Sequence, residues 1–137
     1  MTEMSPSGPV VPAGETLLRA ITRPEWWDPE ERHLSSAAFA WPKFSASILS
    51  KLADEDEMLR RFQQGTGLAR FNCGDARTLG FDAHHEPEDG HDDHAHVYST
   101  DLSGNQRKKR ARRLVEAAEI ARDPNNELLR EALNKGR

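Results

Sequence analysis

The segment from Asp82 to His96 is the richest part of the chain in side chains that can do chemistry. It holds five of the six histidines and six carboxylates. Neutral imidazole and carboxylate together suit Zn, Ni, Cu, Mn or Fe. The candidate metal ligands are His91, Asp93, His94 and His96. No fixed ligand spacing is recognisable, so a solvated acidic loop without a metal remains the alternative.

A second chemical feature is the run of cations between Gln106 and Arg113, with six positive charges in eight positions. That density can contact several phosphates and gives salt-sensitive binding. Because no aromatic residue follows Tyr98, bases cannot stack on the tail, and contact with nucleic acid would be electrostatic. The candidate polyanion-binding residues are Arg107, Lys108, Lys109, Arg110, Arg112 and Arg113.

Charge is separated along the chain. Residues 1–105 hold nine Lys/Arg against eighteen Asp/Glu, which gives −9, whereas residues 106–137 hold ten against five, which gives +5. Such asymmetry indicates a nucleic-acid or acidic-protein partner for the tail, or a tail that docks on its own acidic body. If the tail docks on the body, we expect it to meet the His/Asp-rich segment.

A third candidate site combines polar residues from separate segments. An arginine on a first strand, serines after a loop and a histidine on a later strand resemble the layout of small ADP-ribosyltransferase-like folds, in which such groups hold a dinucleotide. The resemblance implies a small transferase or hydrolase. Its candidate catalytic residues are Arg19, Ser35, Ser36 and His96. The late-strand glutamate of those transferases has no counterpart here.

These residues also have structural interpretations. Arg19 could pair with a carboxylate, Ser35 could cap a turn before Ala37, and the strand histidines could be satisfied by the backbone. The layout Arg-x-Ile at 19–21, Ser-Ser-x-Ala-Phe at 35–39 and His-Ala-x-Val at 94–97 also resembles small bacterial proteins of uncharacterised function. That resemblance implies no activity.

The elements that would position these groups predict an α+β fold, with a small mixed or antiparallel sheet, one packed helix and a C-terminal helical hairpin. Residue preference and punctuation predict strands at 16–21, 67–73 and 94–99, a helix at 54–65, and an acidic loop from Phe81 onward. Residues 44–52 fit either a strand or a helix. In the tail, Ser103 should cap a helix that runs to Arg122, and Asp123-Pro124 should start another over 125–134.

Length and composition limit the remaining possibilities. A chain of 137 residues suits one core, which gives a disordered leader at 1–14, an α+β domain at 15–102 and a basic helical tail at 103–137. The apolar runs are too short to span a membrane. The single cysteine, Cys73, excludes an intrachain disulfide and fits the bacterial cytoplasm.

The charge pattern and these limits favour a non-enzymatic accessory protein whose tail contacts a polyanion or an acidic partner. A transferase or hydrolase and a metal-binding protein are the alternatives.

Overall fold

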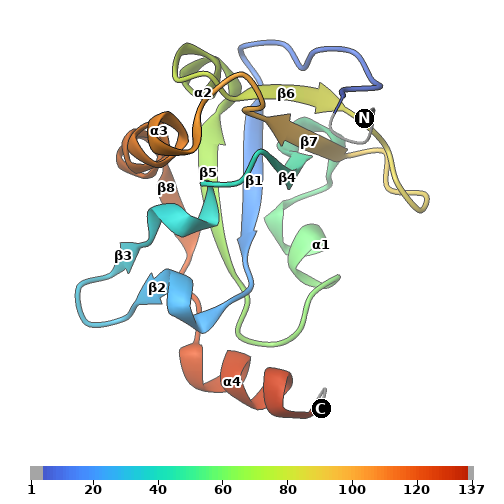
Figure 1. Ribbon diagram of the computed structural model, residues 1–137. Coiled ribbons are helices and arrows are strands. Elements are labelled where there is room, and N and C mark those ends of the chain that lie inside the picture. Colours follow the sequence, from blue (N-terminus) through green and yellow to red (C-terminus); the bar gives the residue numbers. More distant parts are fainter. Residues whose placement is uncertain (1–4, 136–137) are drawn as a thin grey trace.

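A six-stranded antiparallel sheet forms the centre of the protein (Figure 1). The computed structural model describes residues 5–135. In chain order the strands of this sheet are β1 Thr16–Ile21, β4 Lys43–Ile48, β5 Gly67–Asn72, β6 Asp82–His85, β7 His94–Tyr98 and β8 Glu119–Arg122. Their spatial order is β6-β7-β4-β1-β5-β8. The expected α+β class is therefore confirmed.

Short elements and helices surround the sheet. They are the 3-10 turns η1 Pro24–Trp26, η2 Ser36–Ala38 and η3 Leu49–Lys51, the two-stranded ribbon β2 Trp27–Asp28 and β3 His33–Leu34, and the helices α1 Glu55–Leu59, α2 Cys73–Thr78, α3 Gly104–Ala117 and α4 Asn126–Lys135. In Figure 1, α3 and the β2–β3 ribbon lie on one side of the sheet and α1 lies on the other.

Alternation along β1 supplies both faces of the sheet with apolar side chains. Leu17 belongs to the main core, in which the Phe39 ring lies 5.6 Å from the Phe44 ring and 5.4 Å from the Phe71 ring. Leu18 points to the opposite face and packs in a smaller cluster with Met58 of α1. The main core therefore lies on the α3 side, and the α1 side is more thinly covered.

The sheet opens between β1 and β4. β1 pairs with β5 along its whole length, but it pairs with β4 only through Leu17 and Leu18. Beyond Leu18, the side chain of Arg19 occupies the opening and donates a hydrogen bond from Nη1 to the carbonyl oxygen of Ser45 at 3.2 Å. The Arg19 side chain thus donates a hydrogen bond to β4 at a position where the backbones of β1 and β4 are not paired.

Most of the predicted elements of the body are present. The strands at 16–21, 67–73 and 94–99 are confirmed to within one residue, and the ambiguous 44–52 segment is a strand followed by a 3-10 turn. The predicted 54–65 helix ends at Leu59, and the side chain of Asp54 caps its start. The predicted acidic loop is wrong at its start, because residues 82–85 pair with β7 as strand β6.

The tail differs from the predicted helical hairpin. Ser103 caps α3 with a capping box, but the helix ends at Ala117, and residues 119–122 form β8 on the free edge of β5. The backbone of β5 needs hydrogen-bond partners at that edge, and this requirement outweighs the helical preference of the segment. Asn125, not Asp123, caps α4 through a hydrogen bond from the Leu128 N–H. Gly136, expected after this helix, lies outside the described residues.

The N-terminal segment also differs from the expected disordered leader. Residues 1–4 of that leader lie outside the described part, but from Ser7 the chain runs beside β6. The Val11 N–H donates to the Ala83 carbonyl at 2.9 Å, and the His85 N–H donates to the Pro9 carbonyl at 2.8 Å. Gly8 lies so close to the His85 carbonyl that a Cβ would not fit. Val11 is buried in the main core.

Helix α3 docks on the body through apolar side chains. Ala111 and Leu114 are fully buried in the main core, where α3 packs against η2 and α2. The principal contacts of α3 are thus with η2 and α2, and not with the His/Asp-rich segment that was the expected docking surface. None of the helices within residues 5–135 combines the length and apolar character needed to cross a membrane.

Leu114 provides a test of whether the tail belongs to the folding unit. Replacing Leu114 with Ala removes a fully buried side chain, so we expect the free energy of unfolding to fall by about 2–5 kcal/mol. Urea denaturation measures this loss, and Lys108→Ala on the exposed face of α3 should change stability by less than about 0.5 kcal/mol. Equal effects of the two substitutions would show that α3 does not stabilise the sheet.

Candidate metal centre

Strand β7 presents two histidines on one face of the sheet. His94 and His96 are two residues apart, so both rings project to the same side, and their centroids lie 4.6 Å apart. The neighbouring positions on β4, Ser47 and Ser45, pair with His94 and His96 in the strand register. The histidine pair therefore has a fixed place on the α1 side of the sheet.

Glu88 completes a cluster of three groups that can bind a metal. Its two carboxylate oxygens lie 3.5 Å from His94 Nε2 and 3.6 Å from His96 Nε2. One ligand atom from each residue lies within 4.8 Å of the others. At zinc–ligand distances of about 2.0–2.1 Å, tetrahedral ligand atoms are about 3.3–3.4 Å apart. The carboxylate–imidazole separations are thus close to those of a metal site.

The opposite side of each imidazole ring is held by Glu86. His96 Nδ1 lies 2.8 Å from Glu86 Oε1, and His94 Nδ1 lies 2.9 Å from the backbone carbonyl oxygen of Glu86. With a proton on Nδ1, each ring donates to Glu86 and keeps the Nε2 lone pair free toward Glu88. Metal-binding histidines are oriented by outer hydrogen bonds of this kind.

Glu86 itself is enclosed, with 9% of its surface exposed. The Tyr98 hydroxyl donates to Oε1 at 2.6 Å, and the backbone N–H of Ser7 donates to Oε2 at 2.6 Å. Burial alone would raise the pKa of Glu86, but the hydrogen bonds from Tyr98, Ser7 and His96 outweigh it and lower the pKa to about 2. The outer carboxylate is therefore ionised at neutral pH.

Burial acts on His96 and Tyr98 as well. It lowers the pKa of His96, and the hydrogen bond to Glu86 only partly opposes this effect. For Tyr98, burial and then the hydrogen bond to Glu86 raise the pKa. A neutral imidazole and a neutral phenol result at pH 7, and the neutral imidazole is the form that binds a metal.

Two of the four predicted metal ligands do not join this cluster. Asp93 has 3% of its side chain exposed, and Arg61 binds both of its oxygens at 2.9 Å. That pairing makes Asp93 unsuitable as a ligand. His91 is exposed and lies outside the group of Glu88, His94 and His96. Of the four predicted ligands, His94 and His96 thus lie in a cluster that could hold a metal, whereas Asp93 is paired with Arg61.

Sequence reasoning missed Glu86 and Glu88. The segment that carries them folds back tightly, with backbone hydrogen bonds from the His91 N–H to the Glu88 carbonyl at 2.8 Å and from the Glu86 N–H to the His94 carbonyl at 3.1 Å. Asp89 and Gly90 both have positive φ, which closes the turn. The signal available in the sequence was the Asp89-Gly90 dipeptide, which favours a hairpin turn.

The predicted catalytic residues do not share one cavity. Arg19 lines a cleft of about 390 Å³ together with Ser45, Ser47, His91 and His94, on the α1 side. Ser35 and Ser36 instead line a groove of about 790 Å³ beside α3. Ser35 acts as the N-cap of η2 by accepting a hydrogen bond from the Ala37 N–H, as the structural alternative for this serine predicted. The structure therefore gives Arg19 different serine neighbours from those expected.

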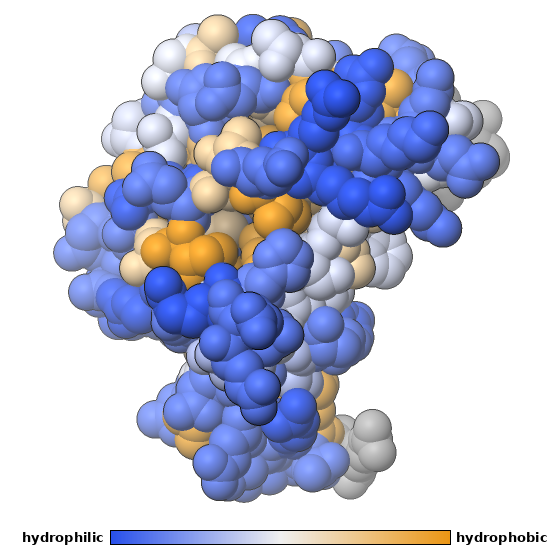
Figure 2. All heavy atoms as spheres, turned by 90° about the vertical axis from the view of Figure 1, so that its left-hand side faces the viewer, coloured by the Kyte–Doolittle hydropathy of each residue, from blue (hydrophilic) through white to orange (hydrophobic). Residues whose placement is uncertain are grey.

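The groove beside α3 brings cations together. Lys109, Arg112 and Arg113 line it with His33, Ser35 and Ser36. Figure 2 shows this side of the molecule, where hydrophilic side chains surround a hollow with an apolar patch. Arg107 does not belong to this surface, because it donates to the Ser99 hydroxyl at 2.8 Å and to the carbonyls of Ser99 and Leu102.

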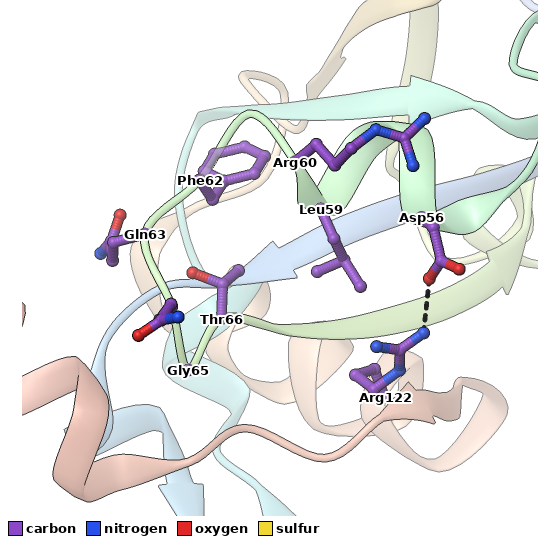
Figure 3. A pocket seen from close by; sticks show the side chains of 9 residues that line it. Asp56, Leu59, Arg60, Phe62, Gln63, Gly65, Thr66 and Arg122 are labelled. Carbon is purple, nitrogen blue, oxygen red and sulfur yellow. Dashed lines mark hydrogen bonds and ion pairs between the residues drawn. The ribbon is translucent and has the colours of Figure 1, made fainter.

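A third depression, of about 520 Å³, lies between α1 and β8 (Figure 3). Its walls carry amide and hydroxyl side chains such as Gln63 and Thr66, and an ion pair of 2.6 Å between Arg122 Nη2 and Asp56 Oδ1 crosses it. The ion pair connects β8 to α1. These contacts explain the depression as a junction between elements, and no chemistry follows from it.

Comparison of the chain with protein-family models, with curated proteins and with solved structures gave no match. Function is therefore derived from the arrangement of the residues.

Arg61 and Asp93 support the wall of the candidate centre and allow a stability test. Replacing Arg61 with Met leaves a buried carboxylate without its bidentate partner, so unfolding should become easier by about 2–4 kcal/mol. Adding Asp93→Asn should recover part of that loss, because the unpaired charge is removed. Urea denaturation of both variants checks this. The neighbouring exposed Arg60→Met should be nearly neutral, and an equal loss there would contradict the assigned role.

Proposed function

We propose that this protein binds a zinc-type divalent cation through Nε2 of His94, Nε2 of His96 and the carboxylate of Glu88. The observation that carries the proposal is that the two rings are oriented alike, each between Glu86 and Glu88. Both Nδ1 atoms are taken up by Glu86, and both Nε2 atoms lie within 3.6 Å of an oxygen of Glu88.

A solvated acidic loop would not produce this arrangement. Solvated carboxylates remain in water, whereas Glu86 is buried and receives hydrogen bonds from Tyr98, Ser7 and His96. Burying an ionised carboxylate carries a large desolvation penalty unless its partners offset it. The buried charge orients the His96 imidazole, and the backbone carbonyl of the same residue orients His94, which supports a role of Glu86 as an outer partner of a metal site.

The ligand set favours a particular class of ion. Two imidazole nitrogens and one carboxylate oxygen suit Zn²⁺ better than Ca²⁺ or Mg²⁺, which prefer oxygen ligands. Three protein ligands leave a coordination position for water or for another molecule, as in catalytic zinc sites. His94 also lines the cleft that contains Arg19, so the open position would be near a cavity. The bacterial cytoplasm remains the proposed location, because the single cysteine is a buried thiol.

Calorimetric titration of the metal-free protein with Zn²⁺ tests the proposal. We expect one ion per chain in the wild type, and loss of at least about tenfold in affinity for His94→Ala, for His96→Ala and for Glu88→Gln. Glu86→Gln should weaken binding by about tenfold without removing a ligand, because His96 loses its charged outer acceptor while His94 keeps the backbone carbonyl of residue 86.

His91→Ala is the matched control, since His91 lies in the same segment but outside the cluster. It should bind Zn²⁺ like the wild type. Equal weakening by His91→Ala and His94→Ala would show diffuse binding by the acidic segment. Wild-type affinity in both His94→Ala and His96→Ala would overturn the proposed site.

A second candidate function rests on a different observation, the cations of α3. None of the ion pairs found within residues 5–135 includes Lys108, Lys109, Arg110, Arg112 or Arg113. Three of these cations line one groove, on a chain whose formal net charge is −4. Concentrated positive charge on an acidic protein supports the binding of a nucleic-acid backbone, which phosphate contacts would position without reading sequence.

Fluorescence anisotropy with a generic DNA duplex tests this second function. Affinity should fall steeply between about 50 and about 200 mM salt, and replacing Lys109, Arg112 and Arg113 together with Gln should reduce the salt slope by roughly 3. The control replaces the exposed Arg23, Arg60 and Arg130, which lie elsewhere on the surface. A salt slope that is the same in both triple variants, or no binding at the lower salt concentration, would exclude the groove.

A further inference from the structure

Arg19 has an unusual environment for a charged side chain. Its guanidinium lies between two aromatic rings, 5.2 Å from the Trp26 centroid and 4.9 Å from the Phe44 centroid. Nε donates to the Ala38 carbonyl at 3.1 Å, and Nη1 donates to the Ser45 carbonyl at 3.2 Å. These contacts fix the plane of the guanidinium at the opening between β1 and β4.

The contacts of Arg19 do not neutralise its charge. Both hydrogen-bond acceptors are uncharged carbonyl oxygens, and within the described residues no carboxylate forms an ion pair with Arg19. Burial, followed by the nearby positive charge of Arg23, lowers the pKa of Arg19 to about 10, so the guanidinium remains charged at neutral pH. A desolvated charge without a counter-ion is costly to the fold.

A structural role explains only part of this arrangement. In its structural role, Arg19 fills the opening between β1 and β4 and donates from Nε and Nη1 to the carbonyl oxygens of Ala38 and Ser45. The positive charge, one N–H of Nη1 and both N–H groups of Nη2 are not used by the protein, since no further hydrogen bond from these atoms is found in the described part. By contrast, the charge of Arg61 in the same cleft wall is paired with the carboxylates of Asp93 and Glu57.

The cavity beside Arg19 can hold a small ligand. Its volume of about 390 Å³ lies within the usual range of ligand sites, about 300–1,000 Å³. Besides Arg19, the lining includes the hydroxyl-bearing residues Thr22, Ser45 and Ser47 and the imidazoles of His91 and His94. Met58 and Phe62 add apolar surface. Such a mixture of one cation, several polar groups and an apolar wall suits an organic molecule with one anionic group.

We propose that the cleft between β1 and β4 binds a small organic anion, with its carboxylate or phosphate group on the guanidinium of Arg19. Arginine presents paired N–H donors that match both groups. A bound anion would supply the counter-charge that the protein lacks at this position. The anion site can be tested apart from the proposed metal, because the hydrogen-bond and ring contacts of Arg19 involve none of the metal-cluster residues, although His94 also lines the cleft.

The experiment uses the full chain after a chelator has removed any metal. The anion proposal is then tested even if the metal proposal fails. NMR spectra that detect the arginine Nε–H group are recorded while inorganic phosphate is added in one series and succinate in another. We expect the Arg19 Nε–H signal and the backbone signals of Thr22, Ser45 and Ser47 to shift saturably with at least one anion. The anion that binds more tightly identifies the preferred group.

Two variants separate the site from general attraction of anions. Arg19→Met removes the charge while keeping an extended side chain, and should weaken binding by at least about tenfold, since a charge-assisted bidentate contact is lost. Arg23→Met removes a neighbouring exposed cation that also lies near Trp26, and should bind like the wild type.

Equal weakening in both variants would show nonspecific screening by positive charge and would overturn the proposal. The proposal would also be overturned if neither anion shifted the Arg19 signal of the wild type saturably. This result needs no variant and holds even if Arg19→Met fails to fold. If the anions shift signals of Lys109, Arg112 and Arg113 but not those of the cleft, the anion site is the groove beside α3 and the proposal is wrong.

Discussion

The buried carboxylate of Glu86 is the contact on which the candidate centre depends. It receives hydrogen bonds from His96 and Tyr98 on β7 and from Ser7 and Gly8 in the N-terminal segment, so it joins parts of the chain about eighty residues apart. An ionised group at this depth is tolerated only when its partners are all in place. Formation of the histidine pair and docking of the N-terminal segment are therefore one structural event.

Arg19 presents the complementary case of a buried cation whose charge is not matched. The guanidinium donates to a backbone carbonyl of β4 where the sheet opens between β1 and β4, and the rings of Trp26 and Phe44 lie against it. The opening and the cleft have the same origin, because strands that separate leave room for a side chain and for a cavity beside it. The candidate metal cluster and Arg19 thus border one cavity, through His94, without direct contact between their charges.

The sequence was most informative where local chemistry decides structure. Alternating apolar residues placed β1, β5 and β7, and the Asp54 and Ser103 caps marked two helix starts, because these signals act within a few residues. Aromatic character alone did not decide burial, since Trp26 and Phe39 are buried whereas Trp41 is 45% exposed. The strand expected at 94–99 also accounts for His94 and His96 on one face, because alternate residues of a strand project to the same side. Local signals could not reveal β8 or the ordered N-terminal segment, since both are held by hydrogen bonds to distant strands.

The candidate sites show the same division. By itself the sequence determined which chemistry was available: imidazoles and carboxylates in one segment, cations in another, and one arginine on the first strand. Only the tertiary structure decided that Asp93 binds Arg61, that Glu86 and Glu88 lie on opposite sides of the two imidazoles, and that Arg19 has no carboxylate partner among the described residues. The reason is physical. Composition sets the possible charges and ligands, but pairing, desolvation and orientation depend on distances between residues far apart in the chain, and these exist only after the sheet has formed.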